Sequence, residues 1–206
     1  VIQKKEHYDL FYINIRSFEK HFEDLQIDLH ANQSSCVCLV ETWINPEVAI
    51  HKDFNGKLFY GASFGKGKGC CAFIPQDCKF ITKNIQDFYQ LLSFQFQQNI
   101  QVILVYMSKT FSSGYAQVKN SLVDIFDSSM KKVIIGDFNF DASEKNCLVE
   151  YFHQCGLQQV VQEPTHDEGR RIDHVYVSSG IVELVEVKVL FKYYSDHAAL
   201  LIKLKP

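Results

Sequence analysis

The strongest constraint on the fold is a short apolar segment that ends in polar residues. Residues 131–140 read KKVIIGDFNF. A β-branched run between lysines and a glycine predicts a buried strand, after which Asp137 and Asn139 emerge. If the strand pleat continues, these two side chains point the same way, and Gly136 lets the backbone turn sharply and approach a ligand. We therefore expect an active-site floor here; the alternative is an ordinary turn after a core strand.

Two later segments each place an Asp-His pair against an apolar run. Asp173 and His174 precede residues 175–177, and Asp196 and His197 precede residues 198–202. The chain has only eight histidines, so two such pairs beside the Asp137 segment favour acid–base chemistry over two surface turns. Strand alternation predicts that His174 faces away from Asp173, in a packing or substrate-edge position.

Composition excludes several classes of protein. With 206 residues, 47% hydrophobic and 22% charged, the chain suits one domain, residues 1–206, and its start at Val1 predicts excision from a longer polypeptide. No apolar stretch is long enough to span a bilayer, so no membrane partner is expected. A net charge of −3 gives no global basic field. The seven cysteines, mostly in apolar surroundings, favour a reducing, intracellular compartment.

Two strands near the amino terminus also end in polar residues. Residues 8–15 predict a strand that ends near Asn14, and Ser17 can cap a helix over 20–30. Residues 36–40 predict a buried strand that delivers Glu41. A carboxylate in that position needs a partner, and a divalent cation is the natural one.

The remaining segments alternate between strand and helix patterns. We predict further strands at 57–64, 70–74, 87–97, 100–107, 182–191 and 198–204, and helices at 113–130 and 143–154.

Three of these segments resemble signature motifs of the endonuclease/exonuclease/phosphatase superfamily, which includes DNase I, apurinic/apyrimidinic endonucleases and the endonuclease domains of LINE-type retrotransposons. They are Gly136-Asp137-Phe138-Asn139, Arg171-Ile172-Asp173-His174 and Ser195-Asp196-His197. The resemblance implies an α/β fold, a four-layered sandwich of two packed mixed β-sheets flanked by helices.

The resemblance also implies a site. Mg²⁺, with Mn²⁺ as a possible substitute, would be held by Glu41, with Asp196 and Asn14 acting through water. His197, oriented by Asp173, would contact the scissile phosphate. Asp137 would position or deprotonate the attacking water, and Asn139 and Tyr106 would bind phosphate oxygens. The remaining substrate contacts are expected from Arg16, Lys109, Arg170 and Arg171, with His166 in a DNA-contact or solvent position.

The implied activity is Mg²⁺-dependent nicking of double-stranded DNA to leave a 3′-hydroxyl, by a mobile-element domain acting in the nucleus beside a reverse transcriptase or helicase. An abasic-site repair endonuclease is the first alternative. Apurinic endonucleases carry an acidic residue where Arg16 stands, and their Tyr-x-Pro-Asn stretch has Pro and Asn where Ser108 and Lys109 stand after Tyr106. A phosphatase or phosphodiesterase of the superfamily, or a catalytically dead relic, are the others.

Overall fold

Two six-stranded sheets form the centre of the protein in the computed structural model, which describes residues 8–44, 54–62, 67–96, 99–108 and 112–205. The first sheet has the order β11 (Val185–Leu190), β12 (Ala199–Leu204), β1 (Tyr8–Asn14), β2 (Cys36–Val40), β4 (Cys70–Ile74), β3 (Leu58–Ala62). The second has the order β5 (Lys79–Ile85), β6 (Tyr89–Phe96), β7 (Ile100–Met107), β8 (Lys131–Asp137), β10 (Asp173–Ser178), β9 (Leu157–Gln159). Both sheets are mixed, since β1 pairs with β2 and β7 with β8 in parallel.

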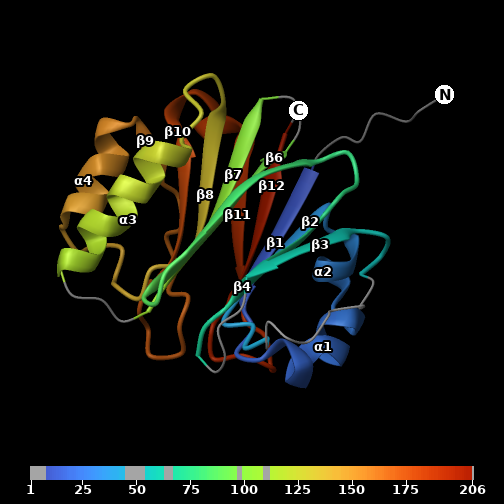
Figure 1. The fold of residues 1–206 in the computed structure, drawn as a ribbon. Coiled ribbons are helices and arrows are strands. Elements are labelled where there is room, and N and C mark those ends of the chain that lie inside the picture. Colours follow the sequence, from blue (N-terminus) through green and yellow to red (C-terminus); the bar gives the residue numbers. More distant parts are fainter. Residues whose placement is uncertain (1–7, 45–53, 63–66, 97–98, 109–111, 206) are drawn as a thin grey trace.

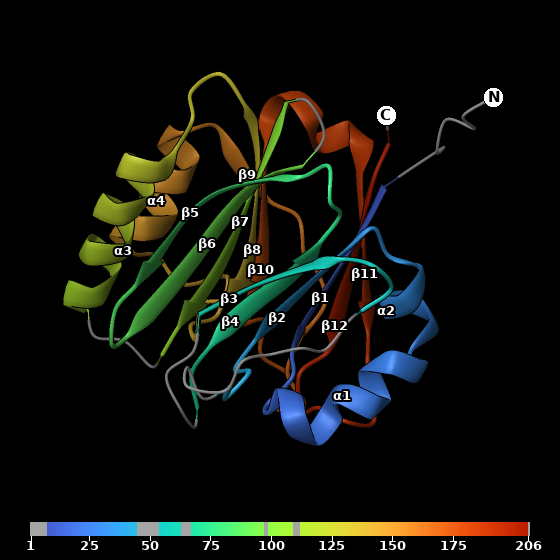
Figure 2. The ribbon, with the colours of Figure 1, turned by 45° about the vertical axis from the view of Figure 1, so that its right-hand side comes forward.

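Helices cover the outer faces of the two sheets. Helices α1 (Phe18–Ile27) and α2 (Leu29–Gln33) lie on the first sheet, and α3 (Ser112–Ile125) and α4 (Cys147–Gln154) lie on the second (Figures 1 and 2). A 3₁₀ helix, η1 (Ser179–Leu184), joins β10 to β11. The predicted four-layered α/β sandwich is confirmed. In the part of the chain that the structure describes, no helix is both long and apolar enough to cross a membrane.

The core explains why the strands read as continuous apolar runs. Along β1, Leu10 and Tyr12 enter the cluster between the sheets, while Phe11 and Ile13 enter the cluster beneath α1 and α2. A third cluster fills the space between the second sheet and helices α3 and α4. A strand that is buried on both faces cannot alternate between apolar and polar residues.

Gly136 has a structural role different from the predicted one. It lies inside β8, not in a turn, and is paired with Val105 on β7. A Cβ atom at this position would stand 1.8 Å from the Val105 carbonyl oxygen. The glycine therefore allows two neighbouring backbones to approach closely, not a backbone and a ligand.

Several predicted boundaries are wrong. The helix expected over 20–30 is broken at Asp28, whose carboxylate caps α2 by accepting from the His30 and Ala31 amides, and Ile27 and Leu29 are exposed. Helix α4 begins only after its cap, Asn146. The strand expected over 182–191 starts as η1, and β5 was not predicted.

Candidate active site

The polar residues singled out from the sequence gather where strands from both sheets end. Asn14 ends β1 and Glu41 follows β2 in the first sheet, while Asp137 ends β8 and Asp173 begins the antiparallel strand β10 in the second. Asp173 and Asp137 are register partners. His197 lies just before β12. Glu41 is partly exposed, and the other four side chains are buried.

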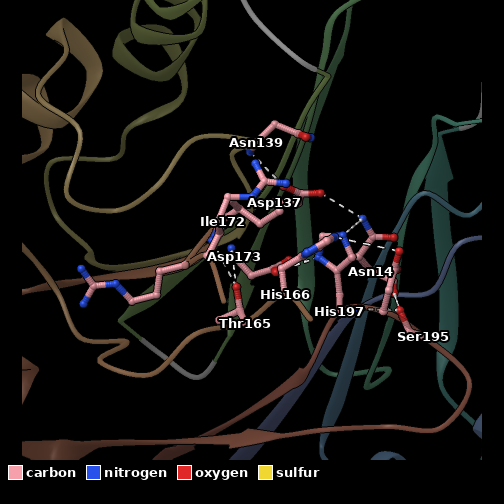
Figure 3. A network of polar contacts seen from close by, with 12 residues as sticks. Asn14, Asp137, Asn139, Thr165, His166, Ile172, Asp173, Ser195 and His197 are labelled. Atoms are coloured by element: carbon pink, nitrogen blue, oxygen red, sulfur yellow. Dashed lines mark hydrogen bonds and ion pairs between the residues drawn. The ribbon is translucent and has the colours of Figure 1, made fainter. Parts of the chain in front are cut away.

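Asn14 connects the two sheets. Its Nδ2 donates to Asp137 Oδ2 at 2.9 Å and to Glu41 Oε1 at 3.1 Å, and it lies 3.4 Å from His197 Nε2 (Figure 3). Its Oδ1 accepts from the backbone amide of Arg16 at 3.3 Å. Asn14 therefore presents a donor to two carboxylates, and its oxygen faces the backbone.

Asp173 orients the ring of His197. The distance from His197 Nδ1 to Asp173 Oδ2 is 2.8 Å, which leaves Nε2 facing Asn14. The other oxygen, Oδ1, accepts from the buried Tyr12 hydroxyl at 2.7 Å. Thr165 Oγ1 accepts from the backbone amide of Asp173 at 3.0 Å. Tyr12 and Thr165 thus support the pair, and neither was singled out as a site residue from the sequence.

Ser195 holds the loop that carries His197. Its Oγ donates to the Asn14 carbonyl at 2.7 Å and accepts from the His197 amide at 3.1 Å. The loop and the end of β1 are thereby fixed to each other, which places His197 beside Asn14 (Figure 3).

Burial and neighbouring charge shift the proton affinities of this cluster. Burial, followed by the charge of Asp173, raises the pKa of Asp137 to about 8, although His197 opposes the shift. Burial alone would lower the pKa of His197, but the charges of Asp173, Asp137 and Asp196 outweigh it and raise the pKa to about 9. Burial, followed by the charge of Asp173, also raises the pKa of Tyr12, so the phenol stays a donor.

Tyr106 and Asn139 lie beside the cluster with their polar groups engaged elsewhere. The Tyr106 hydroxyl donates to the Gly67 carbonyl at 2.6 Å. Asn139 Nδ2 donates to the Met107 carbonyl at 2.5 Å. The expectation that Asn139 and Asp137 share a direction is wrong, because the strand ends at Asp137 and Asn139 has a φ of 54°. Figure 3 shows Asn139 apart from the Asn14–His197 contacts.

The predicted substrate-binding cations are not gathered in one place. Arg16 forms an ion pair with Asp196 at the edge of the site. Arg170 donates to Glu168 at 2.8 Å on the surface, and Arg171 Nη1 lies 3.4 Å from the Val161 carbonyl oxygen. Lys109 lies outside the described residues.

The two other histidines of these motifs have different roles. His174 is buried with its ring stacked on Phe138 at 4.8 Å, and burial lowers its pKa to about 4. Of its two expected positions, packing and substrate edge, it therefore occupies the packing one. His166 packs edge-to-face on His197, with 4.8 Å between the ring centroids, and its Nε2 is 3.9 Å from Asp196 Oδ2. Nothing near His166 in the sequence indicates that it lies beside His197, because this contact depends on the bridge between residues 166 and 197.

The carboxylates of the cluster fit an oxygen-preferring cation. Asp137, Asp173 and His197 offer ligand atoms that lie within 4.8 Å of one another. Asp196 Oδ1 is buried and has no hydrogen-bond partner among the described residues. Mg²⁺ takes one or two carboxylates and keeps several waters, and this donor set suits it.

Comparisons with known proteins place the fold. No family model matches the chain, and no curated protein matches its sequence. Solved structures similar to it include the endonuclease domain of TRAS1, a telomere-specific non-LTR retrotransposon, at 16% identity and a TM-score of 0.71, covering 97% of this chain and 98% of that one. An AP endonuclease from Archaeoglobus fulgidus matches at 14% identity and a TM-score of 0.77, covering 95% and 98%. The 3′ phosphatase NExo from Neisseria, bound to a product DNA hairpin, matches at 16% identity and a TM-score of 0.75, and the match covers 97% of this chain and 100% of that one.

The protein therefore has the fold of the endonuclease/exonuclease/phosphatase superfamily, the DNase I-like α/β sandwich. Solved structures with this fold include nucleases and a 3′ phosphatase.

Proposed function

We propose that the protein is a Mg²⁺-dependent DNA endonuclease that nicks one strand and leaves a 3′-hydroxyl, as the endonuclease domain of a mobile element. The observation that carries the proposal is the shared donor Asn14, which joins Asp137 of one sheet to Glu41 of the other and lies against His197. This brings carboxylates for a cation and an oriented imidazole to one place, as phosphodiester hydrolysis requires.

The proposed function also implies a longer polypeptide around this domain. Residues 1–206 act as a single domain of a longer polypeptide, which also carries an activity such as a reverse transcriptase or helicase and works on nuclear DNA. The retrotransposon endonuclease domain that covers 97% of this chain supports this context.

Glu41 is the proposed direct ligand of Mg²⁺, and Asp196 and Asn14 complete its surroundings. When bound, Mg²⁺ neutralises charge on the phosphate oxygens and stabilises the leaving oxygen. The unpaired Oδ1 of Asp196 and the partial exposure of Glu41 support these assignments.

His197 and Asp137 are the proposed acid–base pair. With its pKa raised to about 9, His197 holds a proton at neutral pH, and its Nε2 can donate to a phosphate oxygen while Asp173 fixes the ring. Asp137 accepts the proton of the water that attacks phosphorus. The P–O3′ bond then breaks, and the leaving O3′ takes a proton from solvent water, which gives a 3′-hydroxyl and a 5′-phosphate. The raised pKa of Asp137 makes it a stronger base than an ordinary aspartate once ionised.

The other candidate contacts are assigned by position. Tyr106 and Asn139 border the site and would bind phosphate oxygens after exchanging their present backbone partners. Arg16 would bind the backbone of the DNA strand near Asp196. Lys109, Arg170 and Arg171 are proposed for more distant phosphates.

An abasic-site repair endonuclease is the second candidate, favoured by the similarity to an archaeal AP endonuclease. Arg16 argues against it, since it places a cation, paired with Asp196, where apurinic endonucleases have an acid. The phosphatase alternative is favoured by the similarity to NExo.

Nicking of supercoiled plasmid tests the proposal. The wild type, Asp137→Asn and His197→Ala are compared in Mg²⁺ and in EDTA, with His153→Ala as a matched control, because His153 is exposed on α4. We expect Mg²⁺-dependent nicks with 3′-hydroxyl ends, lost in the first two variants and kept in the control. Cleavage confined to a duplex with an abasic site would indicate the repair alternative. Phosphate release from a 3′-phosphorylated oligonucleotide or an inositol phosphate, with no plasmid nicking, would indicate a phosphatase.

A further inference from the structure

A cavity of about 360 Å³ opens beside the candidate active site. It is lined by residues from the end of β1, from α1, from the segment after β2 and from the loop before β12: Arg16, Lys20, His21, Trp43, Tyr193, Tyr194, Ser195 and Asp196. Ser195 and Asp196 directly precede His197, and Trp43 Nε1 lies 3.4 Å from Glu41 Oε2. The cavity is therefore continuous with the site but does not contain the acid–base pair.

Its lining combines two cations with three aromatic rings. Arg16 and Lys20 are exposed, so both can bind an anion, and Asp196 is the carboxylate that Arg16 already pairs with. Tyr193 has 79% of its surface exposed, an unusual position for a large ring. Flat exposed rings beside cations are the chemistry that binds an unstacked nucleotide, through base stacking and a phosphate contact.

The tyrosines are held in place by α1. Tyr193 donates its hydroxyl to Asp24 at 2.5 Å, and Tyr194 donates to Asp28 at 2.9 Å. The two rings meet edge to face, with centroids 5.3 Å apart. Because its hydroxyl is engaged, Tyr193 offers a ring face rather than a polar end to a ligand, whereas Tyr194, only 6% exposed, packs against it.

We propose that this cavity binds one unpaired nucleotide of the DNA strand next to the scissile phosphate, with its base against Tyr193 and Trp43 and its phosphate at Arg16 and Lys20. The inference rests on the proposed function and narrows its substrate to DNA with an unstacked nucleotide beside the cleavage point. A volume near the lower end of the about 300–1,000 Å³ of small-molecule pockets has room for one nucleotide and not for a stacked base pair.

Trp43 gives a direct signal of occupancy, since it is the single tryptophan of the chain. The full chain is titrated in EDTA, which prevents cleavage, with a short duplex carrying one unpaired adenine and with the fully paired duplex. We expect saturable quenching of tryptophan emission and tighter binding with the first. Tyr193→Ala should weaken that binding by about 5- to 150-fold, the range for one stacked base. Tyr193→Phe should not, because it keeps the ring and loses only the Asp24 contact.

Two controls separate stacking and charge from general effects. Phe191→Ala removes an exposed ring two residues from Tyr193 that does not line the cavity, and should bind as the wild type does. Lys20→Gln should reduce the dependence of log K on log salt by about 0.7, the value for one phosphate contact on a single strand.

The proposal is overturned if the two duplexes bind with equal affinity, or if Tyr193→Ala and Phe191→Ala have the same affinity for the duplex with the unpaired adenine. It is also overturned if the emission of Trp43 does not change on binding. Full quenching by dAMP alone would overturn it as well, because the cavity would then be a site for free nucleotides. Because binding is read without cleavage, an inactive protein that still distinguishes the duplexes would contradict only the proposed function. An active nickase that does not distinguish them would contradict only the cavity assignment.

Discussion

Replacing Asp173 by asparagine should change the protonation of His197 more than any other single change at the site. Asp173→Asn keeps the shape of the side chain and its position beside Tyr12 and Thr165, but removes the charge 2.8 Å from His197 Nδ1. Burial, which lowers the pKa of the His197 imidazolium, is then no longer opposed by the charge of Asp173. The pKa of His197 should fall from about 9 to its ordinary value near 6.5 or below. That fall corresponds to about 3 kcal/mol.

Proton binding by His197 also sets a pH dependence of stability. A pKa that is raised in the folded protein stabilises it fully below the unfolded value of 6.5, and the stabilisation is lost as the pH rises to about 9. Asp137 acts in the same direction, because its raised pKa lowers stability as the pH rises from about 4 to about 8. The free energy of unfolding of the metal-free wild type should therefore decline relative to Asp173→Asn between pH 6.5 and 9.

The assay is an NMR titration of the histidine ring carbons in EDTA, with the His197 signal assigned by its loss in His197→Gln. Asp124→Asn, which removes one exposed charge on α3, is the control and should leave the titration unchanged. A wild-type His197 that titrates near 6.5, or one that is unmoved by Asp173→Asn, would refute the electrostatic account of the pair.

Three further variants test other parts of the structure. Tyr12→Phe removes the hydroxyl that donates to Asp173 at 2.7 Å. Urea unfolding should show that the free energy of unfolding falls by about 1.5–3 kcal/mol, and an unchanged value would contradict the contact. Gly136→Ala places a Cβ 1.8 Å from the Val105 carbonyl oxygen, so β7 and β8 must separate. We expect the free energy of unfolding to fall by about 4 kcal/mol or more, and a near-normal melting temperature would contradict this. His174→Gln removes a buried ring whose pKa is lowered to about 4, so stability that is present above pH 6.5 is lost as the pH falls toward 4. The wild type should lose up to about 3 kcal/mol more than this variant between pH 7 and 4 in urea unfolding, and equal losses would exclude the effect.

Much of the site could be predicted because its residues follow apolar strands. Asn14, Glu41 and Asp137 each come at the end of such a run, and the structure brings the two carboxylates to the side-chain amide of Asn14. Local sequence contains this information, since strand periodicity and the polar residue that ends it are both short-range signals.

Other parts depend on contacts between distant segments. Tyr12 is one of ten tyrosines and lies in an apolar run, so nothing near it in the sequence indicates a partner 161 residues away. The predicted direction of the Asn139 side chain is wrong because the residue type alone does not reveal that its backbone is left-handed. The late start of α4 reflects a choice between two polar residues that can both cap a helix, Ser143 and Asn146.

The division of the site between the two sheets links ligand binding to the integrity of the whole domain. Asn14, Glu41 and His197 lie in or next to strands of one sheet, and Asp137 and Asp173 lie in strands of the other. A ligand that contacts both groups is bound only while the sheets are packed together, so binding adds RT ln(1 + [L]/Kd) to the free energy of separating them. Amide hydrogens in the centres of both sheets should then gain the same protection from exchange on substrate binding, although the strands concerned lie far from the ligand.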